Sequence, residues 1–79
     1  MNYNSKMTGR IISQLRMERG MSQEVLSGLA GIARSHLAMI ETGRKNANVD
    51  TLWRIANALG MPLSELIRTV EVTMEQEEK

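Results

Sequence analysis

The sequence predicts an all-α protein with a single domain of five helices, and three observations lead to this prediction. The chain of 79 residues is long enough for one small domain. Its hydrophobic residues, 42% of the chain against 3% aromatic, are mainly Leu, Ile, Ala and Met at helical spacing. Glycines stand where the apolar stretches end, as they do after many helices.

The five helices follow in chain order and are separated by short polar segments. They are expected over about residues 8–19, 23–30, 34–41, 49–59 and 63–70. We expect residues 1–7 to be a flexible N-terminus and residues 8–70 to form the domain. The acidic tail, residues 71–79, is interpreted either as additional helix or as disorder.

The first three helices have recognisable ends. The first buries Ile12 and Leu15 and stops at Gly20. Ser22 stands before the second, where its hydroxyl can accept a hydrogen bond from a first-turn amide. Gly31 marks the turn after the second helix, and Gly43 follows the third.

The last two helices are indicated in the same way. Asn48 is a suitable N-cap for the fourth helix, which ends before Gly60. Its apolar residues recur at intervals of three and four and form one stripe, Leu52, Ile55, Ala56 and Leu59. Pro62 opens the fifth helix, because proline is well tolerated in a first turn.

The segment from residue 21 to residue 44 is the most informative part of the chain. Two short helices joined by a turn that contains glycine form a helix-turn-helix, whose second helix enters the DNA major groove. At ~100° per residue, the second of these helices has an inner face of Ala33, Leu37 and Ile40. Its outer face carries the candidates for base contacts, Arg34, Ser35, Ala38 and Met39.

These residue types suit the reading of base edges. The guanidinium of Arg34 can bind guanine O6 and N7 together, and an apolar side chain such as Met39 can meet a thymine methyl group. The alternatives are an ordinary solvated arginine at residue 34 and a capping role for Ser35.

The charges are unevenly distributed along the chain. Residues 1–48 hold seven Lys or Arg against three acids, whereas residues 49–79 hold three against six. The basic half contains the helix-turn-helix. This division suits a protein with one surface for DNA and another that faces elsewhere.

Composition also excludes several classes of protein. The chain has no Cys and one His, which excludes disulfides and makes a metal site or a cofactor unexpected. No nucleophile–base pair or carboxylate pair indicates an enzyme. No apolar run approaches the length of a membrane span, and the N-terminus lacks a signal peptide, so a cytoplasmic protein is expected.

Residues 9–67 resemble the Cro/repressor-type helix-turn-helix domains, the XRE family of phage repressors, restriction-modification controllers and small bacterial regulators. Four segments carry the resemblance, Ser22–Glu24, Ile40–Arg44, Leu52–Gly60 and Met61–Leu66. The resemblance implies the lambda-repressor-like fold of five short helices around one core. It also implies an ion pair between Arg16 and Glu41 across the first and third helices, and a bacterial or phage origin.

Polar residues around the helix-turn-helix are the candidates for phosphate contacts. They are Ser22, Gln23, His36, Thr42, Arg44, Lys45 and Asn46. The resemblance places Gln23 at the DNA backbone, and helix N-termini favour anions. A solvated glutamine, a packing histidine and a solvated basic loop are the alternatives for Gln23, for His36 and for Arg44 with Lys45.

Apolar residues exceed what one small core needs near the fifth helix, and such a surplus indicates self-association. The candidates for a dimer interface are Trp53, Ile67, Val70 and Val72. Trp53 can alternatively cap the core or pack on the fifth helix.

These observations together predict a transcriptional regulator that binds double-stranded DNA sequence-specifically, as a homodimer on a palindromic operator. Two alternatives remain open. The first is an antitoxin or restriction-modification controller, for which the acidic tail could bind a protein partner. The second is a protein-interaction adaptor that keeps the fold without binding DNA.

Overall fold

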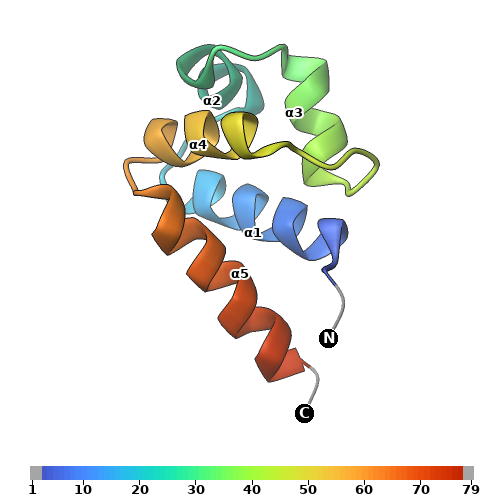
Figure 1. Ribbon diagram of the computed structural model, residues 1–79. Helices are drawn as coiled ribbons and strands as arrows, with labels where there is room; N and C mark the ends of the chain where they lie inside the picture. The colour runs from blue at the N-terminus through green and yellow to red at the C-terminus, as the bar shows by residue number, and fades with distance from the viewer. Residues whose placement is uncertain (1–2, 78–79) are drawn as a thin grey trace.

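The computed structural model describes residues 3–77 and contains five α-helices joined by short turns and loops (Figure 1). They are α1 (Ser5–Glu18), α2 (Gln23–Ala30), α3 (Arg34–Glu41), α4 (Val49–Ala58) and α5 (Leu63–Glu77). The prediction of an all-α, five-helix domain is confirmed. The bounds of α2 and α3 agree with those predicted: Ser22 and Gly31 flank α2, and Gly43 follows the end of α3.

Capping side chains define three of the helix starts. The Ser22 hydroxyl accepts a hydrogen bond from the Val25 amide at 3.1 Å, and the Asn48 side chain accepts one from the Thr51 amide at 2.8 Å. These bonds satisfy first-turn donors that have no partner within the helix. α1 is capped by Asn4, whose side chain accepts from the Lys6 amide.

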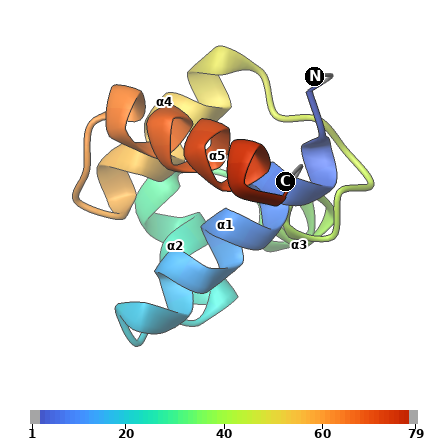
Figure 2. The same ribbon diagram turned by 90° about the horizontal axis from the view of Figure 1, so that it is seen from below.

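The helices pack around one aliphatic core. α1 packs against α3 and α5, while α2 packs against α3 and α4, and α4 also packs against α5. Figure 2 shows α5 crossing α1 when the molecule is seen from below. The largest fully buried side chains come from all five helices and are Ile12, Leu26, Leu37, Ile40, Ile55 and Leu66.

α1 begins earlier than expected. Its first residue is Ser5, Met7 and Thr8 are buried, and the Thr8 hydroxyl donates to the Tyr3 hydroxyl at 2.8 Å. The expectation of a flexible segment over residues 1–7 is therefore wrong for residues 5–7, because Met7 supplies an apolar anchor and Asn4 a cap. Residues 1–2 lie outside the described part of the chain.

α5 continues well past the expected boundary at residue 70. Met74 is buried, and Glu77 forms an ion pair with Arg10 of α1, so residues 71–77 are additional helix rather than disorder. Residues 78–79 fall beyond the described range. The longer helix also corrects one assignment: Val70 is 4% exposed and belongs to the core, not to an exposed dimer surface.

Gly9 allows α1 and α3 to approach closely. It is buried in the middle of α1, and a Cβ added to it would overlap the Ile40 carbonyl oxygen and lie 2.7 Å from that of Glu41. Backbone atoms cannot move aside as the end of a flexible side chain can. Gly9 therefore fixes the distance between α1 and the C-terminal end of α3.

Two glycine substitutions should shift the stability in opposite directions. Gly9→Ala should lower the free energy of unfolding by about 1–3 kcal/mol, because the methyl group overpacks the α1–α3 contact. Gly28→Ala in α2 is the control. It has no heavy atom within 4 Å of the added Cβ and should stabilise by up to about 1 kcal/mol through helix propensity. Urea denaturation measures both, and equal shifts would contradict the proposed close contact.

Candidate nucleic-acid interface

α2 and α3 form a helix-turn-helix whose turn depends on Gly31. This residue has φ of +72°, and the next amide, that of Ile32, donates to the Ser27 carbonyl at 3.0 Å. A left-handed residue at this position closes the end of a helix and redirects the chain. α3 then begins at Arg34 with Ala33 as its N-cap, which provides no side-chain hydrogen bond.

α3 has one buried face and one exposed face. Leu37 and Ile40 are buried, whereas Arg34, Ser35 and Met39 are exposed. Ala38 is only partly exposed. The predicted inner position of Ala33 is wrong: it is exposed, because it precedes the helix and does not follow its periodicity. Half-buried Ile32 packs against the core instead.

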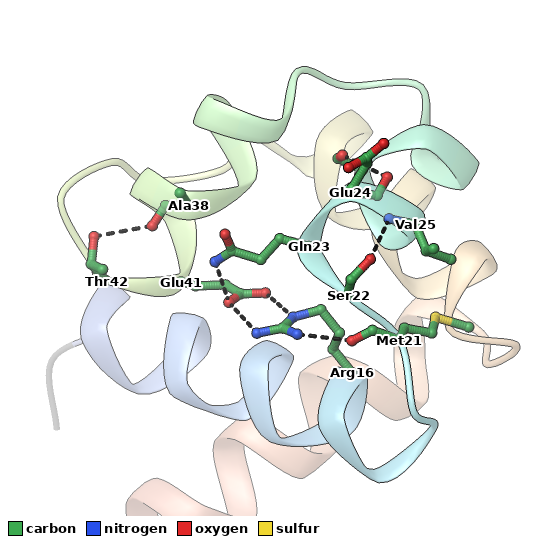
Figure 3. Close-up of polar contacts among 10 residues, drawn as sticks. Arg16, Met21, Ser22, Gln23, Glu24, Val25, Ala38, Glu41 and Thr42 are labelled. Atoms are coloured by element: carbon green, nitrogen blue, oxygen red, sulfur yellow. Dashed lines mark hydrogen bonds and ion pairs between the residues drawn. The ribbon is translucent and has the colours of Figure 1, made fainter.

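A buried ion pair fixes α3 to α1. Arg16 Nε and Nη2 donate to the two carboxylate oxygens of Glu41 at 2.8 and 3.0 Å, and Arg16 Nη1 donates to the Met21 carbonyl at 2.8 Å (Figure 3). The side chains are 13% and 5% exposed. The parallel bonds define both distance and orientation, so they fix the angle of α3 on the core.

This carboxylate also stabilises the charged form of Arg16. The hydrogen bonds to Glu41, helped by its negative charge, raise the pKa of the Arg16 guanidinium above its ordinary value, although burial acts in the opposite direction. The partner carboxylate thus outweighs the cost of partial burial for the charged form of Arg16.

Gln23 extends the ion pair to α2. Its Nε2 donates to Glu41 Oε1 at 3.0 Å, which engages one of the two amide protons (Figure 3). The second proton and the backbone N–H at the start of α2 remain for another acceptor. The sequence alone did not predict this contact, because Gln23 and Glu41 are eighteen residues apart.

The hydroxyl groups of Ser22 and Thr42 differ in whether their proton is free to be donated to a phosphate. Ser22 accepts in its cap, so its own proton is free for a phosphate oxygen. The Thr42 hydroxyl instead donates to the Ala38 and Met39 carbonyls at 3.1 and 3.2 Å. In this conformation Thr42 has no proton for a phosphate, which counts against its predicted contact.

The loop after α3 holds the other phosphate candidates. Arg44, Lys45 and Asn46 are all exposed, while the Arg44 and Lys45 amides donate to the Met39 carbonyl and shape the loop. His36 lies half-buried on α3, with Leu37 and Ala38 next to it.

The remaining dimer candidates lie on the outer surface of α4 and α5. Trp53 is 57% exposed, and Ile67 and Val72 are each 40% exposed. Trp53 and Ile67 line a shallow groove with Leu63 and Arg68. Large exposed apolar side chains of this kind favour a protein contact.

Two further features concern metals and membranes. Within residues 3–77, no three His, Asp or Glu side chains gather as a metal site would need. None of the helices described here has the length and apolar character required to cross a bilayer.

Comparison with known proteins identifies the family. A model of helix-turn-helix proteins (HTH_3) matches residues 12–66, and the chain belongs to this family. The family consists of DNA-binding transcriptional regulators. The resemblance to the XRE-type regulators and the predicted class of protein are thus confirmed.

Individual relatives agree with this assignment. The chain is 35% identical over 68 residues to the uncharacterized HTH-type transcriptional regulator y4dJ of Sinorhizobium fredii, covering 86% of this chain and 88% of that one. It is 38% identical over 71 residues to the immunity repressor protein of Bacillus phage phi105. That match covers 90% of this chain but 48% of the repressor, so this chain spans about half of the phage protein.

A solved structure shows the same fold. The restriction-modification controller protein C.AhdI from Aeromonas hydrophila superposes with a TM-score of 0.76 at 32% identity. The match covers 78% of this chain and 94% of the controller.

The buried ion pair can be tested by removing its carboxylate. Glu41→Ala should lower the free energy of unfolding by about 3 kcal/mol or more, because Arg16 is left buried without its partner. Glu24→Ala, on the exposed side of α2, is the control and should change it by less than about 0.5 kcal/mol. Chemical denaturation gives both values, and similar midpoints for the two variants would refute a structural role for Glu41.

Proposed function

We propose that this protein binds a specific sequence of double-stranded DNA as a homodimer and regulates transcription by occupying a palindromic operator. The observation that carries the proposal is the exposed face of α3, which opens with Arg34 and is held on the core by the buried Arg16–Glu41 pair. A rigidly placed helix with an exposed arginine at its start suits the major groove.

Base recognition is assigned to the outer face of α3. Arg34 has no ion-pair partner within residues 3–77, so its guanidinium is available to guanine. Ser35 adds a hydroxyl that can meet a base or a phosphate. Met39 supplies apolar contact to a thymine methyl group. Ala38 offers less apolar surface for the same kind of contact, because it is partly buried.

Backbone contacts are assigned to both sides of α3. Ser22 and Gln23 offer a hydroxyl proton, an amide proton and backbone N–H groups at the start of α2. Arg44, Lys45 and Asn46 offer charge and an amide from the exposed loop, and half-buried His36 on α3 is a further candidate. Such contacts set the register of the protein on DNA, whereas α3 reads the sequence.

Dimerisation is assigned to the groove between α4 and α5. Trp53 and Ile67 supply apolar surface, and Arg68 lies between Glu65 and Glu71 along α5. A second copy related by a two-fold axis presents the same charges in reverse order, so each arginine can meet a carboxylate. Val72 extends the apolar surface along the same helix.

The dimer also explains how eight-residue helices could select an operator. One recognition helix reads few base pairs, whereas two helices about 34 Å apart read both half-sites of a palindrome. The relatives come from bacteria and a bacteriophage, which supports action in the cytoplasm of a bacterial host, without catalysis or a cofactor.

A restriction-modification controller is the second candidate. It is favoured by the similarity to C.AhdI, because this chain covers almost the whole of that controller at 32% identity. Footprinting distinguishes a restriction-modification controller from another kind of transcriptional regulator. It is carried out on the DNA upstream of the gene for this protein and upstream of any adjacent endonuclease gene. Protection upstream of an endonuclease gene supports the controller.

Loss of the recognition arginine should reduce specificity. Arg34→Ala should weaken binding to an operator selected from random duplexes by about 1–3 kcal/mol and relax the preference at one base pair per half-site. Because Arg34 is exposed, the thermal midpoint should hardly change. Titrations compare the operator with a scrambled duplex. An equal loss on both would show that Arg34 contacts phosphate instead.

A charge placed in the apolar groove between α4 and α5 should separate the protomers. Ile67→Glu should shift the protein from dimer to monomer at micromolar concentration, because a carboxylate would be buried without a partner. Leu29→Glu is the control, since Leu29 is 63% exposed on α2 and lies outside the groove. Sedimentation measures the mass of each variant. A monomeric wild type, or an Ile67→Glu variant that still dimerises, would place the interface elsewhere or remove it.

A further inference from the structure

The first turn of α1 is fixed against the loop that follows α3. Gly43 has φ of +79°, and a Cβ added to it would lie 2.8 Å from the Lys6 Cα and would overlap the Lys6 side-chain stem. The Ser5 hydroxyl donates to the Gly43 carbonyl at 3.4 Å. Figure 1 shows the start of α1 beside this loop. Segments almost forty residues apart are therefore held together.

This contact brings three positive charges to one end of α3. Lys6, Arg44 and Lys45 are all exposed, and no ion pair within the described residues involves any of them. The nearest acid along the chain, Glu41, is already engaged by Arg16. Like charges repel one another, so three neighbouring cations are destabilised by their mutual repulsion. A nearby anion relieves this repulsion, and the cluster therefore favours anion binding. We call these three residues the Lys6 cluster.

We propose that Lys6 is a DNA-backbone contact, so that the nucleic-acid interface extends from α2 and α3 onto the first turn of α1. This inference rests on the proposed DNA binding of α3. The sequence alone does not connect Lys6 with DNA, because it predicts a flexible segment over residues 1–7. The packing of the Gly43 loop on the start of α1 gives Lys6 its fixed position.

The position of the cluster favours phosphates over bases. Arg34 opens α3 and the Lys6 cluster lies beyond its other end, where Gly43 follows two residues after Glu41. The N-terminal residues of a recognition helix contact the base edges in the major groove, and α3 is about 12 Å long, so its other end lies well away from those contacts. Charges just beyond such a helix can therefore meet the phosphates that border the groove.

The anchored stem of Lys6 makes it a better contact than a free surface lysine. Its Cα, Cβ and Cγ all lie against Gly43, which restricts the rotamers that binding would otherwise have to fix. Lysine binds phosphate as a point charge and needs no fixed fork geometry. The contact is thus independent of DNA sequence.

The test measures how the affinity for a labelled duplex of mixed sequence depends on salt. Each phosphate contact adds about 0.9 to the negative slope of log K against log salt concentration. Lys6→Gln should reduce the magnitude of this slope by ~0.9 per protomer, as Lys45→Gln should. Glutamine keeps Cβ and Cγ, so the packing against Gly43 is preserved, and circular dichroism should show unchanged helix content.

Two further variants serve as controls. Lys6→Arg keeps the charge and should retain the wild-type slope. Arg10→Gln removes a cation one turn along α1 that is already paired with Glu77, and should also leave the slope unchanged. A wild-type slope in Lys6→Gln beside a reduced slope in Lys45→Gln would overturn this inference alone. So would an equal loss in Arg10→Gln, because it would indicate a long-range charge effect. A wild type that binds neither this duplex nor any sequence selected from random duplexes would overturn DNA binding itself.

Discussion

The buried pair of Arg16 and Glu41 is the interaction on which the position of α3 depends. One carboxylate accepts three hydrogen bonds, two from Arg16 in α1 and one from Gln23 at the start of α2. A buried pair costs desolvation and need not add net stability. What it adds is geometry, since both helices of the helix-turn-helix are oriented by the same group. Gly9 completes this arrangement by allowing the backbones of α1 and α3 to touch.

The sequence predicted the parts of the structure that depend on local signals. Caps such as Ser22 and Asn48 and the glycine after α2 define helix ends through contacts within a few residues. The burial of Leu37 and Ile40 follows from helical periodicity. The ion pair itself came from the family resemblance, because no local rule connects residues that are twenty-five positions apart.

Two expectations about single side chains differ in how the structure bears on them. The apolar surplus of the fifth helix places Val70 among the dimer candidates, whereas α5 packs against the core and buries Val70 together with Met74. The predicted phosphate contact of Thr42 stays a prediction, and the donation of its hydroxyl proton to the Ala38 and Met39 carbonyls counts against it. The acceptor that a threonine hydroxyl selects at the end of a helix depends on its rotamer, which the sequence does not specify.

α1 connects the proposed DNA surface to the proposed dimer surface. It packs against α3 through Gly9 and Arg16 on one side and against α5 on the other, where Arg10 pairs with Glu77. In a two-fold dimer formed through α5, the distance between the two recognition helices therefore depends on how rigidly α1 joins α5 to α3. Half-sites one helical turn apart, ~34 Å, tolerate little variation in that distance. The extended α5 and the close contact at Gly9 then serve one requirement, which is to fix α3 relative to the dimer axis.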